Sequence, residues 1–223
     1  MKEAAVQALW DLLWRWLYPI YMLRRKRVSQ HLLGSLTISS GETCLELGGP
    51  TRRWQDAAER FGVKTIVLNI DMNHLIRFRT LYHSPVFVVL GDATRIPLKD
   101  NSVDYVISYA LLEHITVERR FHFAQEIMRV ARKGYYIATP YYWFPFEPHY
   151  WMPFFQFVPE FFKKWLTQKV RVGMIYKESY EPIALATKRE LRRLFPQANI
   201  TGFSFTGVVP ETIVAWWRSN QCL

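Results

Sequence analysis

The segment TCLELGGPTRRW at residues 43–54 constrains the fold of this chain more than any other stretch. The apolar run around Glu46 predicts a buried strand, and Gly48 and Gly49 allow the backbone to turn tightly behind it. A helical pattern then begins and continues over residues 52–60. A strand, a glycine turn and a helix in this order form the first unit of a nucleotide-binding α/β sheet.

The glycine turn departs from the dinucleotide-binding fingerprint. That fingerprint places glycine at three positions, because the backbone must approach a pyrophosphate closely. Pro50 and Arg52 stand where the second and third glycines would fall. A nicotinamide-dependent oxidoreductase is therefore the least favoured class of function for this chain.

The composition sets bounds on the domain count and on the partners. A chain of 223 residues without a Gly- or Ser-rich linker predicts one domain with an appendage. A formal charge of +10 together with nine tryptophans favours a membrane surface or nucleic acid as partner. Cys44 and Cys222 are too few for a disulfide framework or a paired zinc site, which fits a reducing cytoplasm. No metal site is expected.

The amino-terminal segment predicts a helix at the membrane interface. Residues 9–23 are rich in aromatic and apolar side chains, and four basic residues follow at 24–27. The run is fifteen residues long and contains Asp11, Arg15 and Pro19, so it falls short of the roughly 20 apolar residues that span a bilayer. A secretory signal is not expected, because the basic cluster follows the apolar run. The alternative is a helix that packs on the core.

Apolar runs farther along the chain predict strands that alternate with helices. This alternation implies right-handed crossovers and a doubly wound parallel sheet. The predicted strands are Lys64–Ile70, Pro85–Leu90, Val103–Ser108 and Gly134–Thr139; the predicted helices are Ser29–Leu36, which ends near Gly34, and Val117–Arg132.

Asp71 follows the second predicted strand. An acid at this position meets ribose hydroxyls through charge-assisted hydrogen bonds in nucleotide-binding sheets. The alternative is that Asp71 caps the next helix, and one aspartate can do both.

The segment GDATRIPLKDNSVDYVISYALLEHI at residues 91–115 resembles the central block of class I S-adenosylmethionine-dependent methyltransferases of the type 11 kind. The resemblance continues through QEIMRVARKG at residues 125–134 and covers about 42–218 in all. It implies a Rossmann-like α/β fold with a seven-stranded sheet, whose last strand is antiparallel, and helices on both faces. It also implies a helix over Thr187–Phe195 and strands over Asn199–Phe205 and Glu211–Arg218.

The same resemblance implies a set of contacts to S-adenosyl-L-methionine. The first-strand acid and the glycine turn hold the methionine end, the second-strand acid holds the ribose, and the residues after the third and fourth strands border the adenine and the sulfonium. The candidate cofactor-binding residues are Glu46, Gly48, Gly49, Asp71, Met72, Asp92, Ala93, Ser108 and Tyr109.

An aromatic insertion at about residues 140–186 separates the fifth strand from the helix at 187–195. Thirteen of the twenty-five residues at 141–165 are aromatic, and four prolines in that window exclude one long regular element. We expect an irregular cap, or a pair of short helices, that closes the substrate site and exposes rings to the N-terminal helix or to a bilayer. Its motif TPYYWFPFEPHY resembles that of a bacterial subgroup of these methyltransferases.

Four side chains near the expected site carry acid–base chemistry. An oxygen nucleophile must lose its proton during methyl transfer, and histidine or a carboxylate can take it. The catalytic candidates are His149, His114, Glu147 and Glu113. The alternative is structural: His149 and Glu147 hold the cap by hydrogen bonds, and Glu113 and His114 orient the loop after the fourth strand.

Taken together, these features predict a cytoplasmic S-adenosylmethionine-dependent methyltransferase peripheral to the membrane. Residues 1–41 form an aromatic and basic segment, and residues 42–223 form the methyltransferase domain. The expected acceptor is apolar or lipid-linked, such as a quinone precursor, an isoprenoid or a lipid-borne glycan. An anionic membrane surface is expected to contact residues 9–27, and 141–165 is a second candidate.

Two other classes stay open beside the oxidoreductase. A non-catalytic binding or scaffold protein that keeps the fold is favoured by Pro50 and Arg52. A nucleic-acid methyltransferase would use the positive charge, but SYALLEH after the fourth predicted strand lacks the Asn/Asp-Pro-Pro-aromatic signature of amino-directed base methylation.

Overall fold

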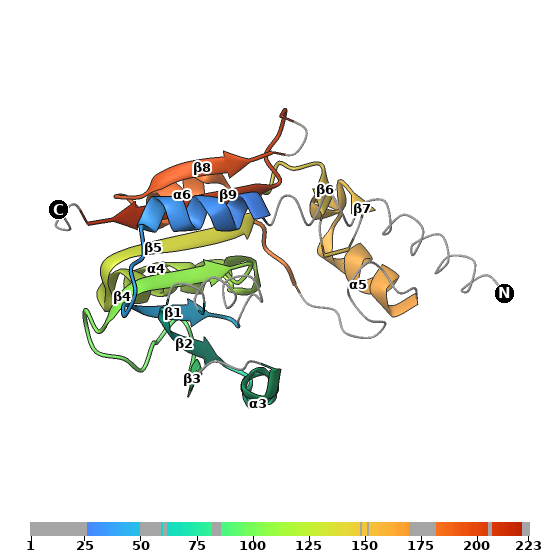
Figure 1. The fold of residues 1–223 in the computed structure, drawn as a ribbon. Helices are drawn as coiled ribbons and strands as arrows, with labels where there is room; N and C mark the ends of the chain where they lie inside the picture. Colours follow the sequence, from blue (N-terminus) through green and yellow to red (C-terminus); the bar gives the residue numbers. More distant parts are fainter. Residues whose placement is uncertain are drawn as a thin grey trace.

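The protein contains one seven-stranded mixed sheet with the strand order β3-β2-β1-β4-β5-β9-β8 (Figure 1). The computed structural model describes residues 26–49, 59, 62–81, 86–147, 149–150, 152–169, 182–204 and 207–219. The strands of the sheet are β1 (Thr43–Leu47), β2 (Lys64–Asn69), β3 (Val86–Leu90), β4 (Val103–Tyr109), β5 (Ala131–Pro140), β8 (Asn199–Phe203) and β9 (Thr212–Arg218).

The pairing of the strands confirms the predicted Rossmann-like architecture. β1 pairs in parallel with β2 on one side and with β4 on the other, and the parallel set continues to β3 and β5. β9 runs antiparallel to both β5 and β8. The last strand is therefore the antiparallel one, as the resemblance implies.

Helices cover both faces of the sheet. On one face lies a helix over residues 26–36, drawn in blue in Figure 1, whose Leu32 and Leu36 are buried against Tyr136 and Val214. This helix belongs to the segment that the sequence separates as residues 1–41, and it forms part of the core. Elsewhere in the described part of the chain lie the helices α3 (Met72–Leu81), α4 (Arg120–Val130), α5 (Glu160–Lys169) and α6 (Lys188–Leu194), with short 3-10 turns η1 (Leu112–His114), η2 (Val117–Arg119) and η3 (Phe155–Phe157).

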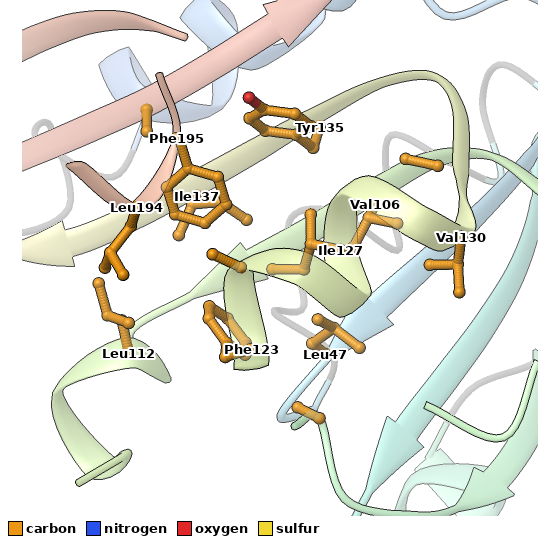
Figure 2. Close-up of a cluster of buried hydrophobic side chains, with 14 of the residues drawn as sticks. Leu47, Val106, Leu112, Phe123, Ile127, Val130, Tyr135, Ile137, Leu194 and Phe195 are labelled. Carbon is orange, nitrogen blue, oxygen red and sulfur yellow. The ribbon is translucent and has the colours of Figure 1, made fainter. Parts of the chain in front are cut away.

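The larger core lies under α4 and α6. In Figure 2, side chains of α4 lie over those of the strands, and Phe195 at the end of α6 lies beside Tyr135 of β5. Phe123 and Ile127 of α4 are fully buried, as are Val106 of β4 and Phe195, which caps α6. Burying a side chain of this size contributes about 1.5–3 kcal/mol, so these side chains hold α4 and α6 against the face of the sheet.

The prediction of one long helix over Val117–Arg132 is wrong at both ends. Its first turn is the 3-10 turn η2, and α4 ends at Val130. Ala131 is already extended, with φ −78° and ψ 120°, and pairs with Val103. Strand β5 therefore begins at Ala131, three residues before the predicted start at Gly134. The exposed Arg132 side chain donates to Asp104 Oδ1 at 2.6 Å.

The helix that the sequence places over Ser29–Leu36 does not end near Gly34. It continues to Leu36, whose side chain is fully buried. Glycine inside a helix costs about 1 kcal/mol, which is less than the gain from burying a leucine. The backbone leaves the helix at Thr37, which has a positive φ of 46°.

The described part of the aromatic insertion has little regular structure. It contains a two-stranded ribbon of β6 (Phe146–Glu147) and β7 (Met152–Pro153), followed by η3 and α5. In Figure 1 the cap lies beyond the carboxyl ends of the parallel strands, at the right of the view.

Several expectations concern residues outside the described part of the chain. These are the N-terminal helix at residues 9–23 with Arg24 and Arg25 of its basic cluster, most of the helix at 52–60 with Pro50 and Arg52, and Cys222. Among the described helices, none has both the length and the apolar character required to cross a bilayer.

Gly134 is predicted to be intolerant of any side chain. A Cβ at this position would lie 2.4 Å from the carbonyl oxygen of Trp217 in the paired strand β9, so Gly134→Ala must push the strands apart. We expect a loss of about 1–3 kcal/mol in the free energy of unfolding, measured by urea titration. The matched control is Gly34→Ala, because Gly34 lies inside a helix and a Cβ there would have no other atom within 4 Å. We expect its free energy of unfolding to rise by up to about 1 kcal/mol. Equal stabilities of the two variants would contradict this account of the sheet.

Candidate functional site

A cavity of about 520 Å³ opens at the carboxyl edge of the sheet. Its wall is built from the segments that follow β1, β2, β3 and β4, at residues 48–49, 69–74, 91–94 and 109–119. Because parallel strands all end at the same edge, these four segments meet although they are far apart in the sequence. The volume lies within the range of small-molecule sites.

The glycine turn after β1 forms one wall of this cavity. Gly48 and Gly49 have φ values of +90° and +131°, which side chains rarely adopt. A Cβ on Gly48 would also lie 3.1 Å from Cδ1 of Leu111. Glycine is required here both by the backbone conformation and by the close approach of the segment after β4.

Asn69 holds this turn in place, although it is not among the residues predicted from the sequence. Its Nδ2 donates to the carbonyl oxygen of Gly48 at 2.6 Å, and its Oδ1 accepts from the N–H of Asp71 at 2.8 Å. The side chain is buried at the end of β2. A polar residue inside the apolar run KTIVLNI was the signal that could have identified it.

Asp71 lies in the cavity wall and also caps α3. Its Oδ1 accepts from the N–H of Asn73 at 2.8 Å, as an N-cap residue does. Its Oδ2 lies 3.8 Å from His74 Nδ1, and the side chain is 44% exposed. One carboxylate therefore caps the helix and remains accessible from the cavity.

Asp92 is held in a small polar network after β3. Its Oδ1 accepts from the N–H and the hydroxyl of Thr94 at 2.8 Å each, and its Oδ2 accepts from Arg119 at 2.6 Å. Partial burial acts to raise the pKa of Asp92, but the hydrogen bonds from Thr94 and Arg119 outweigh it and hold the pKa below its usual value. A carboxylate has about four acceptor positions, so one remains for a ligand. Neither Thr94 nor Arg119 is predicted from the sequence.

The segment after β4 contains an unusual backbone conformation. Ala110 has a positive φ of 49°, and its N–H donates to the carbonyl oxygen of Ala138 at 2.8 Å. A non-glycine residue in this region costs of order 1 kcal/mol, and such residues cluster at functional sites. The turn places Tyr109, Ala110 and Leu111 in the cavity wall.

The structure places some of the predicted cofactor-binding residues in the wall and others outside it. Gly48, Gly49, Asp71, Asp92, Ala93 and Tyr109 line the cavity. Glu46 and Ser108 are fully buried within β1 and β4, where Glu46 pairs in register with Val67 and Ile107. Met72 is exposed at the start of α3 and is not among the lining residues.

The four predicted catalytic residues gather where the cap meets η1. We call Glu113, His114, Glu147 and His149 the His–Glu cluster. His149 Nδ1 lies 2.8 Å from Glu147 Oε1, and His149 Nε2 lies 3.9 Å from Glu113 Oε1. The rings of His114 and His149 meet edge to face, with 5.4 Å between their centroids.

The members of the cluster differ in their access to the cavity. His114 lines the wall, whereas Glu113 is fully buried and receives a hydrogen bond from Thr139 Oγ1 at 2.9 Å. Burial raises the pKa of the Glu113 carboxyl despite the opposing effect of His149. Glu147 also accepts the backbone N–H groups of His149 and Tyr150 at 2.8 and 2.6 Å, so it shapes the β6–β7 turn.

Within the described residues, the cap does not line the cavity directly. It approaches the wall through the contact of His149 with His114. The cap has a smaller cavity of about 160 Å³, lined among others by Glu147, Gln156 and Lys163.

Comparison with known proteins agrees with this geometry. Residues 45–139 match the family model described as "Methyltransferase domain", which supports S-adenosyl-L-methionine as the cofactor. The matched residues run from β1 to β5 and include the walls formed after β1, β2, β3 and β4. A comparison with curated proteins gives no match.

Solved structures share the fold at low sequence identity. The PH0226 protein from Pyrococcus horikoshii OT3 is 13% identical, with a TM-score of 0.63 and coverage of 90% of this chain and 91% of that one. A SAM-dependent methyltransferase from Methanosarcina mazei is 14% identical, with a TM-score of 0.59 and coverage of 82% and 94%. One from Mesorhizobium loti is 12% identical, with a TM-score of 0.58 and coverage of 81% and 92%. At these identities the likeness is one of fold.

Asp71→Asn is predicted to weaken S-adenosyl-L-methionine binding about tenfold. Asparagine still caps α3, but it removes the charge that strengthens a hydrogen bond to a ribose hydroxyl by about 1 kcal/mol or more. Calorimetry on the purified chain measures the affinity. Asp100→Asn, which is exposed and paired with Arg129 away from the cavity, is the control and should bind as the parent does. Unchanged affinity in Asp71→Asn would remove Asp71 from the cofactor site.

Proposed function

We propose that this chain is an S-adenosylmethionine-dependent methyltransferase that works at a membrane surface on an apolar or lipid-linked acceptor. The observation that carries the first part is the convergence of the glycine turn, Asp71 and Asp92 on one cavity. The cavity lies within the region that matches the methyltransferase domain. The membrane and the acceptor are inferred from the cap.

The residues of the cavity fit this cofactor. The Gly48–Gly49 turn presents bare backbone, and the accessible carboxylate of Asp71 suits a pair of ribose hydroxyls. Asp92 has one acceptor position left for an amino group, and the backbone of Ala93 lies beside it in the wall. The cofactor has no pyrophosphate, so the fingerprint glycines that this chain lacks are not needed for it.

Alignment is the main task of the protein in such a reaction. The bound cofactor supplies an activated methyl group, and transfer then depends on the orientation of the acceptor atom. The left-handed turn at Ala110 and the contact of Leu111 with Gly48 give the wall between β1 and β4 a fixed shape. An oxygen acceptor would lose its proton near His114, which lines the cavity and contacts His149.

The surface of the cap supports the inference of a membrane. Six aromatic side chains of the cap are between 42% and 77% exposed: Trp143, Phe154, Phe157, Phe161, Phe162 and Trp165. Phe161 and Trp165 lie four residues apart on α5 and therefore share a helix face. Exposed aromatic rings beside lysine are typical of proteins that insert into the headgroup region, and Lys164 is exposed on the same helix.

The position of the cap supports a lipid-linked acceptor. The cap lies beyond the carboxyl ends of the strands, where the cavity opens (Figure 1). If its exposed rings enter a bilayer, the cavity faces the membrane surface, so an acceptor carried by a lipid reaches it without leaving the bilayer. The formal charge of +10 favours an anionic surface.

Methyl transfer to a lipid fraction is the expected activity. The purified chain is incubated with methyl-labelled S-adenosyl-L-methionine and a total lipid extract of the native host, and in parallel with total nucleic acid. We expect label in the organic phase, reduced several-fold in Asp71→Asn at subsaturating cofactor. Label in the nucleic acid alone would replace the lipid acceptor, and cofactor binding without any transfer to host extracts would favour a scaffold protein.

Flotation with anionic vesicles tests the membrane surface. The double variant Phe161→Ser and Trp165→Ser keeps the charge but removes two exposed rings, so we expect the floated fraction to fall several-fold. Phe121→Ser removes a ring that is 56% exposed on α4, an element outside the cap, and should float as the parent does. A second variant that lacks residues 1–27 measures the share of the N-terminal segment. If none of these changes lowers flotation, neither surface docks on the membrane.

A further inference from the structure

We propose that the His–Glu cluster binds one divalent transition-metal ion, with Zn²⁺ as the first candidate. The ligands are Glu113 and His114 of η1 and His149 of the cap. One ligand atom from each of these residues lies within 4.8 Å of the other two. The site itself stands apart from the proposed function, and only its role in methyl transfer rests on that function.

One oxygen of the buried Glu113 carboxylate lacks a hydrogen-bond donor among the described residues. The side chain is fully buried, and its Oε1 accepts no hydrogen bond from any described residue. His149 Nε2 lies 3.9 Å from Oε1, beyond hydrogen-bond distance. A buried acceptor without a donor costs about 1–3 kcal/mol, and more when it is charged, whereas a cation between Oε1 and Nε2 would satisfy it.

Two of the proposed ligands, Glu113 and His149, are oriented by hydrogen bonds to neighbouring side chains. The other oxygen of Glu113 accepts from Thr139 Oγ1 at 2.9 Å, which fixes the orientation of Oε1. Glu147 accepts from Nδ1 of His149 at 2.8 Å, and a carboxylate at this nitrogen leaves the lone pair of the ring on Nε2. Metal-bound histidines almost always donate their other nitrogen to such a partner.

The ligand set selects the kind of ion. Two imidazoles and one carboxylate suit Zn²⁺ and similar first-row ions better than Mg²⁺ or Ca²⁺, which prefer oxygen ligands alone. Three protein ligands leave a coordination position open, as in catalytic zinc sites. Since His114 also lines the large cavity, that position is close to the acceptor.

The ion would draw the cap toward the cavity. Bonds of about 2.0–2.2 Å bring ligand atoms to about 3.0–3.5 Å from one another, closer than the 3.9 Å that separates His149 Nε2 from Glu113 Oε1. His149 must therefore approach η1. In methyl transfer the ion would favour loss of the acceptor hydroxyl proton to water; the oxygen then bonds to the methyl carbon, and the carbon–sulfur bond breaks with its electron pair on sulfur.

Metal titration of the full chain tests the site. The protein is prepared without a histidine tag, dialysed against a chelator and titrated with ZnCl₂ by calorimetry and with CoCl₂ by visible absorption. We expect one ion per chain, with an affinity on the order of micromolar or tighter. The Co²⁺ spectrum should show the intense bands of a four- or five-coordinate site.

Matched variants locate the ion. His149→Gln and Glu113→Gln should each weaken Zn²⁺ binding at least about 100-fold, and Glu147→Gln, which acts through His149, by about 10- to 100-fold. His122→Gln, exposed on α4, is the control and should bind as the parent does. If Glu113→Gln does not fold, His149→Gln decides, because His149 lies on the cap and not in the sheet or the helices that cover it. Absence of saturable binding, or unchanged binding in His149→Gln, overturns the proposal.

Cofactor binding in the absence of metal separates the two proposals. A chain that binds S-adenosyl-L-methionine but no metal keeps the proposed function and loses the metal site. A chain that binds the metal through His149 but not the cofactor keeps the metal site and loses the proposed function.

Discussion

The parallel pairing of β1 with β2 and β4 is the constraint on which the rest of the structure depends. The register aligns Leu47 with Leu68 on one side and with Ser108 on the other, so the three strands end together. The turn at Gly48 then lies between the segments that follow its two neighbours, and Asn69 connects it to Asp71. The cavity is therefore a consequence of strand pairing, and the helical layers on both faces keep that edge in place.

The cap shows a different kind of organisation. It is short of regular structure, and polar contacts determine its shape: Glu147 accepts three N–H groups around the β6–β7 turn, and Gln156 donates to the carbonyl oxygens of Tyr142 and Phe144. Buried polar networks of this kind favour one arrangement strongly, because each broken contact leaves a desolvated group. The cap can therefore expose many aromatic rings and still hold His149 beside Glu113.

The sequence predicts most of the sheet and part of the site. Strand positions follow from apolar runs. Gly48 and Asp71 follow from residue types at fixed places after strands, whereas Asp92 is named from the resemblance to methyltransferases. Arg119 had no comparable signal, because it is one of many surface arginines and its pairing with Asp92 depends on the approach of η2 to the loop after β3. Glu46 and Ser108 were named from the resemblance, but their side chains are enclosed within the sheet.

By itself, the sequence determined which segments become strands and where the backbone must turn, because periodicity and glycine act over a few neighbouring residues. It also determined the aromatic and prolyl character of the cap. Only the tertiary structure decided that helix α4 ends at Val130, where Ala131 pairs with Val103 in the sheet. It also decided that Glu113, His114 and His149 meet, since the fold must close before residues this far apart in the chain share a desolvated space.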